Sequence, residues 1–266
     1  MERMLHLTGR YYQTVPMNQA GYLEERLDLP ADQTALVSLH SWDIGCPGGP
    51  RVMNDFWVGM GFPQTAQEAY RIMEEAIRPT LDAARAAGVP VCHVQAELIA
   101  RRYPEWHSLH LDNPPGPAGQ APPPVLPGHR ERIVARSHGQ DYDSKSGYAK
   151  MGFPEIVKPL PHEPVVHQSG QFDRILRERK IAHLIYLGFA TDMCILNAPG
   201  GIAPMAGLGY DTILVRDATV GVEFPDWWEE RISTRYAIRF FETHFGDTIV
   251  VDDFIRNCEE LREEHA

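Results

Sequence analysis

The chain has 266 residues and a formal net charge of −11, with 43% hydrophobic and 23% charged residues. This length can bury a full hydrophobic core and fits one large α/β domain as well as two small ones, and the composition is ordinary for a soluble globular protein. The negative charge argues against nucleic acid or an anionic membrane surface as the main partner, because both require a basic surface.

Location and redox state follow from what the sequence lacks. No run approaches the roughly 18 apolar residues that span a bilayer, and the first residues lack the apolar core of a signal peptide. The four cysteines, at positions 46, 92, 194 and 258, are far apart and form no C-x-x-C pair. We therefore expect a cytoplasmic protein with free thiols.

Residues 1–33 show little hydrophobic periodicity, and we expect an N-terminal arm that lies over the domain or over a neighbouring subunit. The first predicted strand covers residues 34–40, a short apolar run that is typical of a strand buried on both faces. Apolar residues at steps of three and four predict a helix over residues 64–87, which Gly88 ends. Residues 89–94 form the second predicted strand.

Residues 97–162 interrupt this alternation of strands and helices. Within them, residues 113–128 contain seven prolines and three glycines, so we expect an irregular insertion. An insertion of this length usually forms a lid over a site or contacts another subunit. We therefore predict a single α/β domain over residues 34–266 that carries this Pro/Gly-rich insertion.

Strands and helices alternate again after the insertion. Strands are predicted over residues 164–168, 182–189, 212–215 and 248–251, and helices over residues 171–180, from about 192, and over 226–244. Such alternation requires a mostly parallel sheet with right-handed crossovers. The predicted fold is an open, mostly parallel six-stranded sheet with helices on both faces, a Rossmann-like three-layer α/β/α architecture.

Ligands of open parallel sheets bind beyond the carboxyl ends of the strands, so the residues that follow each predicted strand are candidate site residues. They are His40 and Asp43, His93 and Gln95, His167 and Gln168, and Thr191 to Cys194.

Cys194 follows a strongly apolar predicted strand by five residues, and we expect it in the first turn of the next helix. The unpaired N–H groups and the positive end of the helix dipole there would lower the pKa of its thiol. The same N–H groups can hold the oxyanion that forms when a thiolate attacks a carbonyl. The alternative interpretation is a buried, unreactive cysteine.

Two short motifs follow neighbouring predicted strands: G-x-x-T-x-x-C over residues 188–194, and Asp217-Ala218-Thr219. As a pair they resemble the signature of the isochorismatase-like family of cysteine hydrolases. The resemblance extends more weakly from about residue 34 to residue 254 and includes Phe172 at the head of the preceding helix. It implies a parallel six-stranded sheet and an isochorismatase-like α/β hydrolase.

The family usually works with an Asp-Lys-Cys triad, and the resemblance implies that Cys194 is the nucleophile. His40 stands where the aspartate normally ends the first strand, and His167 and Gln168 stand where the lysine is expected. His40 can act as a base near neutral pH, whereas Gln168 can replace a lysine only as a hydrogen-bond donor. Because side chains alternate along a strand, His167 and Gln168 cannot both face the site if the strand is regular there.

Asp43 is a further catalytic candidate, because its carboxylate could reach the site if its loop folds back. We expect backbone N–H groups at Cys194 and near Ala190 or Thr191 to stabilise the oxyanion. The resemblance also implies a cis peptide bond before Thr191. Phe189, Trp42 and His93 complete the predicted substrate-binding residues.

These residues predict a cysteine hydrolase that cleaves an amide-type C–N bond of a small-molecule substrate through a Cys194 acyl-enzyme, without an organic cofactor or a bound metal. Two alternatives stay open. One is a family member that binds a small ligand without turnover, and the other is metal-assisted hydrolysis with His40, His93 and His167 as ligands. The resemblance also implies a homo-oligomer, a dimer or a tetramer, with the arm and the insertion as candidate interfaces.

Overall fold

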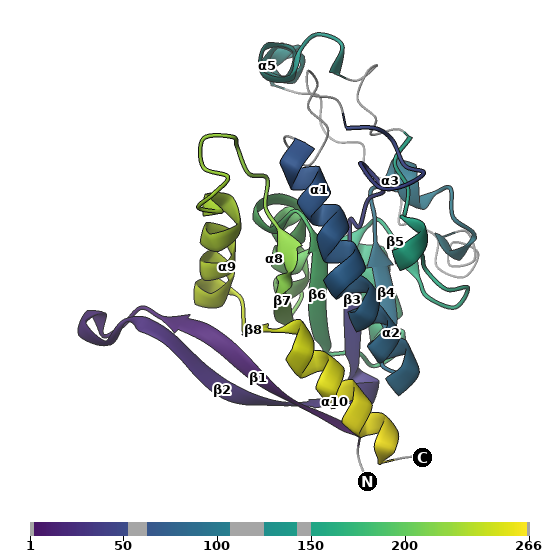
Figure 1. Cartoon of the computed structure of the whole chain (residues 1–266), viewed down its shortest axis with the longest axis vertical. Coiled ribbons are helices and arrows are strands. Elements are labelled where there is room, and N and C mark those ends of the chain that lie inside the picture. The colour runs from purple at the N-terminus through teal and green to yellow at the C-terminus, as the bar shows by residue number, and fades with distance from the viewer. Residues whose placement is uncertain (1–2, 53–62, 107–124, 143–149, 265–266) are drawn as a thin grey trace.

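The computed structural model describes residues 3–52, 63–106, 125–142 and 150–264. One sheet runs through the molecule, with the strand order β2-β1-β8-β7-β6-β3-β4-β5 (Figure 1). Its strands are β1 (Met4–Gln13), β2 (Gly21–Pro30), β3 (Thr34–Leu39), β4 (Val91–Val94), β5 (Val165–Val166), β6 (His183–Phe189), β7 (Asp211–Val220) and β8 (Thr248–Ile249). Strands β3 to β8 pair in parallel.

The predicted α/β fold with an open, mostly parallel sheet is confirmed, but the strand number is wrong, because the sheet has eight strands. The two additional strands come from residues 1–33, where β1 and β2 form an antiparallel hairpin. In β1, Leu5 and Leu7 are buried and alternate with exposed neighbours, whereas β2 is mostly exposed. With one strand exposed to solvent, the arm carries too weak an apolar pattern to predict strands.

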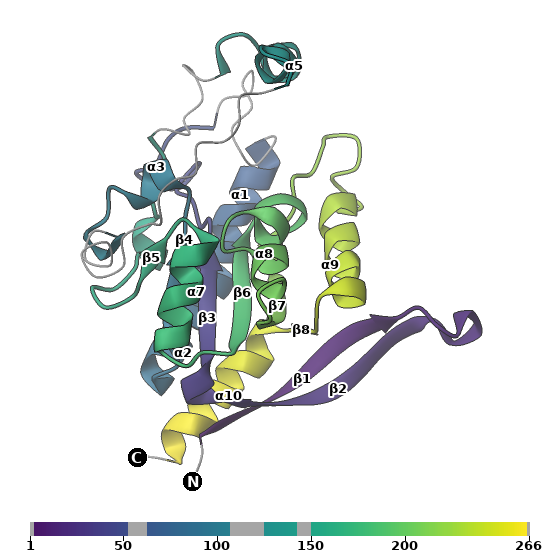
Figure 2. The same cartoon turned by 180° about the vertical axis from the view of Figure 1, so that it is seen from behind.

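The hairpin leaves the domain as a long arm (Figures 1 and 2). Strand β1 pairs with β8 through Arg10 and Thr248, and the last helix packs against β1. There the backbone N–H of His6 donates to Asn257 Oδ1 (2.6 Å), and that of Thr8 donates to Asp253 Oδ2 (2.7 Å). These side-chain acceptors satisfy backbone donors of β1 that would otherwise have no partner in the sheet.

Helices cover both faces of the sheet. One face carries α1 (Pro63–Ile72), α2 (Arg78–Ala87) and α10 (Val251–Glu263), and the other carries α7 (Ser169–Glu178), α8 (Ile202–Ala206) and α9 (Ile232–His244) (Figures 1 and 2). Each layer buries its own apolar cluster against the sheet, with Met73 and Phe254 on one side and Phe172 and Phe241 on the other. The three-layer prediction is confirmed.

Most predicted helices are present with shifted ends. The helix predicted over residues 64–87 is observed as α1, a π-helical turn η3 (Met73–Ile77) and α2, and Gly88 ends it in a left-handed conformation. The helix predicted over residues 226–244 begins only at Ile232, after a series of turns. Within the described residues, no helix is long and apolar enough to cross a membrane.

The insertion contains short helices in its described parts: α3 (Glu97–Ala100), α5 (His129–His138) and the 3₁₀ turn η5 (Glu155–Val157). None of the residues of α5 is buried. Residues 107–124, with most of the proline-rich run, lie outside the described residues, as do residues 143–149. The described parts therefore show where the insertion leaves the sheet, after β4, and where it returns, before β5.

Candidate active site

The last residues of β3, β4 and β5 lie in register, so the residues that follow them form a row across three adjacent strands. This row consists of His40, Gln95 and His167. The backbone N–H of His40 donates to the Val94 carbonyl (3.0 Å), and that of Gln95 donates to the Val166 carbonyl (2.9 Å). The hydrogen-bond ladder thus extends to the row and fixes its backbone at the carboxyl edge of the sheet.

A cavity of about 420 Å³ opens at this edge. Its lining consists of His40, Gln95, Ala96, Glu97, His167, Gln168 and Pro199. Strand β5 already ends at Val166, so the alternation of a regular strand no longer applies to the next two residues. His167 and Gln168 therefore both reach the cavity.

His40 is buried, with 6% of its surface exposed, and its φ of 51° lies in the left-handed region. The imidazole stacks on the Trp42 indole, with ring centroids 4.9 Å apart. Burial lowers the pKa of His40 to about 3, and its buried Nδ1 has no hydrogen-bond partner among the described residues. The ring is therefore neutral at physiological pH and is a weak base in this environment.

His167 is also buried, and the indole N–H of Trp106 donates to its Nδ1 (2.9 Å). Since Nδ1 accepts this bond, the proton of a neutral His167 ring is on Nε2. The Nε2 atom lies 3.6 Å from Glu97 Oε1. His167 thus faces the cavity with a donor next to a carboxylate.

His93, predicted to bind substrate, does not line the cavity. Its Nε2 lies 2.8 Å from Glu163 Oε2, and the same carboxylate accepts two bonds from Arg85. Burial raises the pKa of Glu163, but hydrogen bonds from His93 and Arg85 outweigh this effect and bring it to about 2. Burial lowers the pKa of His93, so a neutral ring donates to the ionised Glu163. This cluster stabilises the insertion against the sheet.

Asp43 is not among the residues that line the cavity. Its Oδ1 accepts a hydrogen bond from the backbone N–H of Gly152 (2.7 Å), and its own N–H donates to the Gly152 carbonyl (3.0 Å). The carboxylate therefore holds the end of the insertion beside the loop after β3.

Cys194 lies in a π-helical turn, η6 (Thr191–Ile195), that directly follows β6. Burial raises the pKa of its thiol; a hydrogen bond with the Ala190 backbone lowers it, and the Asp192 carboxylate raises it, with a net increase. The prediction that a helix N-terminus lowers the pKa of Cys194 is therefore wrong, because burial disfavours the charged thiolate more than the turn stabilises it. No hydrogen bond joins the Cys194 thiol to the His40 ring, although both residues are described.

A hydrogen bond between two hydroxyl groups joins the G-x-x-T-x-x-C motif to the Asp217-Ala218-Thr219 motif. Thr191 Oγ1 lies 2.7 Å from Thr219 Oγ1, and both side chains are buried. A cis peptide bond is present, but it joins Phe189 to Ala190, one residue earlier than expected. Phe189 itself is 1% exposed and packs in the core, and it is not part of the cavity lining.

Metal-assisted hydrolysis, one of the two alternative functions, requires several ligand side chains that point at one metal ion. Over the described ranges, no group of three or more His, Cys, Asp or Glu side chains is arranged to hold a metal ion. His40, His93 and His167 therefore do not form a ligand set, and His93 is engaged by Glu163.

The sequence placed Gln95 among the candidate residues without assigning it a function, and it did not predict the lining residues Glu97 and Pro199. Gln95 was recognisable as a residue after a strand, and its buried amide accepts the Trp42 indole N–H (2.6 Å). Glu97 and Pro199 come from loops whose path the strand pattern does not determine.

No protein-family model matches the chain. The chain is 32% identical over 190 residues to the ureidoacrylate amidohydrolase RutB of Azorhizobium caulinodans, with 68% of this chain and 74% of the relative covered. It is 27% identical over 192 residues to RutB of Agrobacterium fabrum, with 67% and 72% covered. A solved cysteine hydrolase from Pseudomonas syringae pv. phaseolicola covers 88% of this chain and 95% of its own, at 18% identity and a TM-score of 0.54. This likeness shows the fold.

Proposed function

Since this chain belongs to the isochorismatase-like family, we propose that it hydrolyses an amide-type C–N bond of a small molecule with Cys194 as the nucleophile. The names of its relatives support an amidohydrolase. The observation that supports the site most is topological: β3, which leads to His40, lies between β4 and β6, and β6 leads directly into the turn with Cys194. Nucleophile and cavity thus belong to neighbouring strand ends.

In the proposed reaction, the Cys194 sulfur attacks the carbonyl carbon, and an S–C bond forms as the oxygen becomes an oxyanion. Backbone N–H groups at Ala190, Thr191 or Cys194 hold that oxyanion. His40 takes the thiol proton and returns it to the leaving nitrogen as the C–N bond breaks. Water then hydrolyses the thioester and releases the acid. Gln168 binds the substrate as a hydrogen-bond donor.

In the proposed mechanism, the nucleophile and the base are both neutral before the substrate binds. The pKa of Cys194 is raised and that of His40 is lowered to about 3, so a thiol and a neutral imidazole are present at pH 7. Proton transfer between them must therefore accompany attack on a bound substrate. The same observation favours a second candidate function, a protein that binds a small ligand in this cavity without turnover.

A screen of small amides and ureas for ammonia release separates the two functions. We expect wild-type turnover and at least about a thousandfold loss in Cys194→Ala, because the covalent step is removed. Cys258→Ala is the matched control, since burial raises the pKa of this thiol to about 12. Hydrolysis by Cys194→Ala at the wild-type rate would exclude the proposed nucleophile, and binding without ammonia release would support the second candidate.

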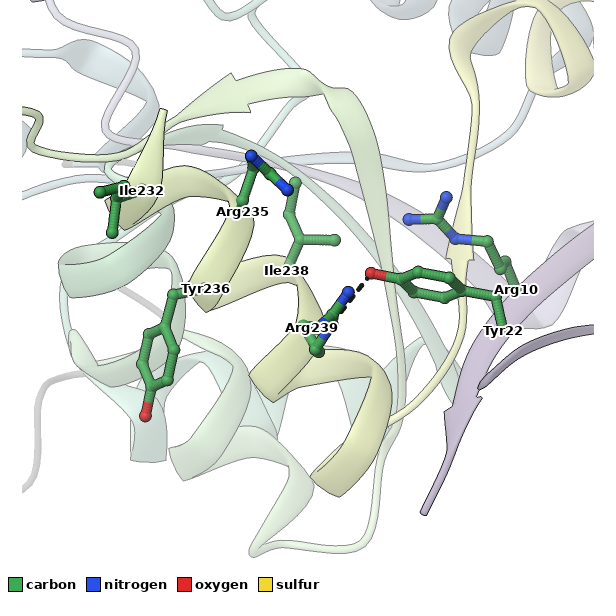
Figure 3. A pocket seen from close by; sticks show the side chains of 7 residues that line it. All are labelled: Arg10, Tyr22, Ile232, Arg235, Tyr236, Ile238 and Arg239. Atoms are coloured by element: carbon green, nitrogen blue, oxygen red, sulfur yellow. Dashed lines mark hydrogen bonds between the residues drawn. The ribbon is translucent and has the colours of Figure 1, made fainter. Parts of the chain in front are cut away.

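We also propose that the chain forms a homo-oligomer, a dimer or a tetramer, through an arm surface that the hairpin and α9 share. Its exposed apolar residues include Met17 at the hairpin tip (87% exposed) and Tyr236 on α9 (67% exposed). Val15 and Leu23 of the hairpin and Ile232 of α9 are also exposed. A cavity of about 600 Å³ lies between the two elements, where Arg239 of α9 donates to the Tyr22 hydroxyl (Figure 3). Large exposed apolar patches are typical of protein interfaces.

A further inference from the structure

The side-chain amide of Gln95 has one orientation that the structure specifies. The indole N–H of Trp42 (2.6 Å) and the backbone N–H of Ala96 (3.1 Å) both donate to the same atom, Oε1. Because both partners are donors, this atom must be the oxygen. The Nε2 amino group therefore points the other way, and Gln95 is part of the cavity lining.

This amino group has no hydrogen-bond partner among the described residues, although only 1% of the Gln95 surface is exposed. Buried donors in folded proteins are almost always paired, and an unpaired one needs an explanation. A second residue of the cavity lining, His40, also has a buried atom without a partner among the described residues, its Nδ1. Two such groups on residues that line one cavity favour a ligand that supplies their partners.

The charge of the cavity limits what that ligand is. Among its described lining residues there is no arginine or lysine, and the one carboxylate is that of Glu97. Glu97 is ion-paired with Arg101, so an anionic group on the ligand would meet this carboxylate with its neighbouring cation already engaged. An uncharged amide or urea fits the polar groups, because its carbonyl accepts from Gln95 and its N–H groups can donate to Glu97.

We propose that Gln95 donates a hydrogen bond to the substrate carbonyl and that this cavity selects uncharged amides or ureas over substrates that carry a carboxylate. This inference rests on the proposed hydrolysis by Cys194 at the neighbouring strand end, and it assigns Gln95 as the residue that binds the substrate carbonyl.

The test uses two ureas of equal length, N-propylurea and 3-ureidopropanoate, which differ in a terminal methyl or carboxylate. We expect wild-type kcat/KM to be at least about tenfold higher for N-propylurea. Gln95→Glu keeps the oxygen that accepts from Trp42 but replaces the amino donor with a second acceptor. It should lower kcat/KM for N-propylurea at least about tenfold, mainly through KM. Gln64→Glu, on the exposed surface of α1, is the matched control and should leave both values unchanged.

Binding to Cys194→Ala, measured by calorimetry with the same two ureas, separates this inference from the proposed chemistry. If no urea is hydrolysed but N-propylurea binds at least about tenfold more tightly, the hydrolysis proposal fails and the specificity holds. Equal or tighter binding of 3-ureidopropanoate, or binding of neither urea, would overturn the inference. Gln95→Met in the Cys194→Ala protein removes the donor without adding charge, and unchanged binding of N-propylurea there would overturn it as well. Thermal unfolding of each variant confirms that the fold is intact.

Discussion

His40 combines a buried ring, a left-handed backbone and a ring nitrogen without a partner in the described part of the chain. A residue other than glycine adopts this conformation only at a cost in free energy, and such residues are concentrated at functional sites. The family resemblance implies an aspartate at the position of His40, and the strand pattern predicted that this residue follows the first parallel strand. It could not predict the loss of basicity, because this follows from the packing of Trp42 and the sheet around the ring.

The buried, neutral His40 ring predicts a loss of stability in acid. Its pKa is about 3 in the folded protein and about 6.5 in an unfolded chain, so the unfolded state binds more protons below pH 6.5. The contribution is constant above pH 6.5 and decreases by about 1.4 kcal/mol per pH unit between pH 6.5 and 3. From pH 6.5 to pH 5 the free energy of unfolding should therefore fall by about 2 kcal/mol more in the wild type than in His40→Gln.

Urea unfolding at pH 7, 6 and 5 measures this difference. His93, whose pKa is also lowered by burial, is present in both proteins, so its contribution cancels in the comparison. The exposed His162→Gln variant is the control and should follow the wild type at each pH. Parallel pH profiles for the wild type and His40→Gln would show that His40 is not buried in a neutral form.

At the scale of elements, the G-x-x-T-x-x-C run is first of all a packing motif. Gly188 has a φ of 117°, and a Cβ atom on it would lie 2.0 Å from the Leu39 carbonyl oxygen. The pairing of β6 with β7 also shifts its register between Tyr186 and Gly188. The glycine therefore allows β6 to approach β3 closely where both strands enter the site.

Gly188→Ala should consequently destabilise the fold strongly. Steric overlap with a backbone atom and an unfavourable φ together predict a loss of at least about 3 kcal/mol, or about 6–12 °C in Tm for a chain of this size. Gly170→Ala is the matched control, because a Cβ there meets nothing within 4 Å and the residue lies in α7. The control should have an unchanged or slightly higher Tm. A wild-type Tm for Gly188→Ala would contradict the packing role.

The elements differ in how far the sequence predicts them. Apolar periodicity predicted the parallel strands and the long helix, because these elements bury their pattern against one core. Strand β5 has only two residues, so alternation along a strand could not predict its early end or that His167 and Gln168 both line the cavity. The contact of Asp43 with Gly152 joins residues 109 positions apart, which no local pattern encodes.

The whole molecule consists of a domain and a projecting hairpin (Figure 1). An exposed edge strand such as β2 invites association with another chain. The arm surface defined above combines this edge with the exposed face of α9, so we expect two copies of the chain to cover it.

Sedimentation velocity at micromolar concentrations tests this expectation. The wild type should sediment as a dimer or a tetramer, and the double variant Met17→Ser/Tyr236→Ser should shift to a smaller species because it loses exposed apolar area. Leu208→Ser, an exposed apolar residue between α8 and β7, is the control and should keep the wild-type state. A monomeric wild type, or a double variant with an unchanged sedimentation coefficient, would contradict the proposed interface.

The hydrogen bonds that hold β1 have a consequence for the order of folding. His6 and Thr8 donate to Asn257 and Asp253, about 250 positions later in the chain. A ribosome synthesises the hairpin long before it synthesises these acceptors, and at a few to about twenty residues per second the delay exceeds ten seconds. During translation the arm can form its own turn, but it cannot be fastened to the domain until α10 has emerged. The docked arm therefore marks a chain whose synthesis has passed α10.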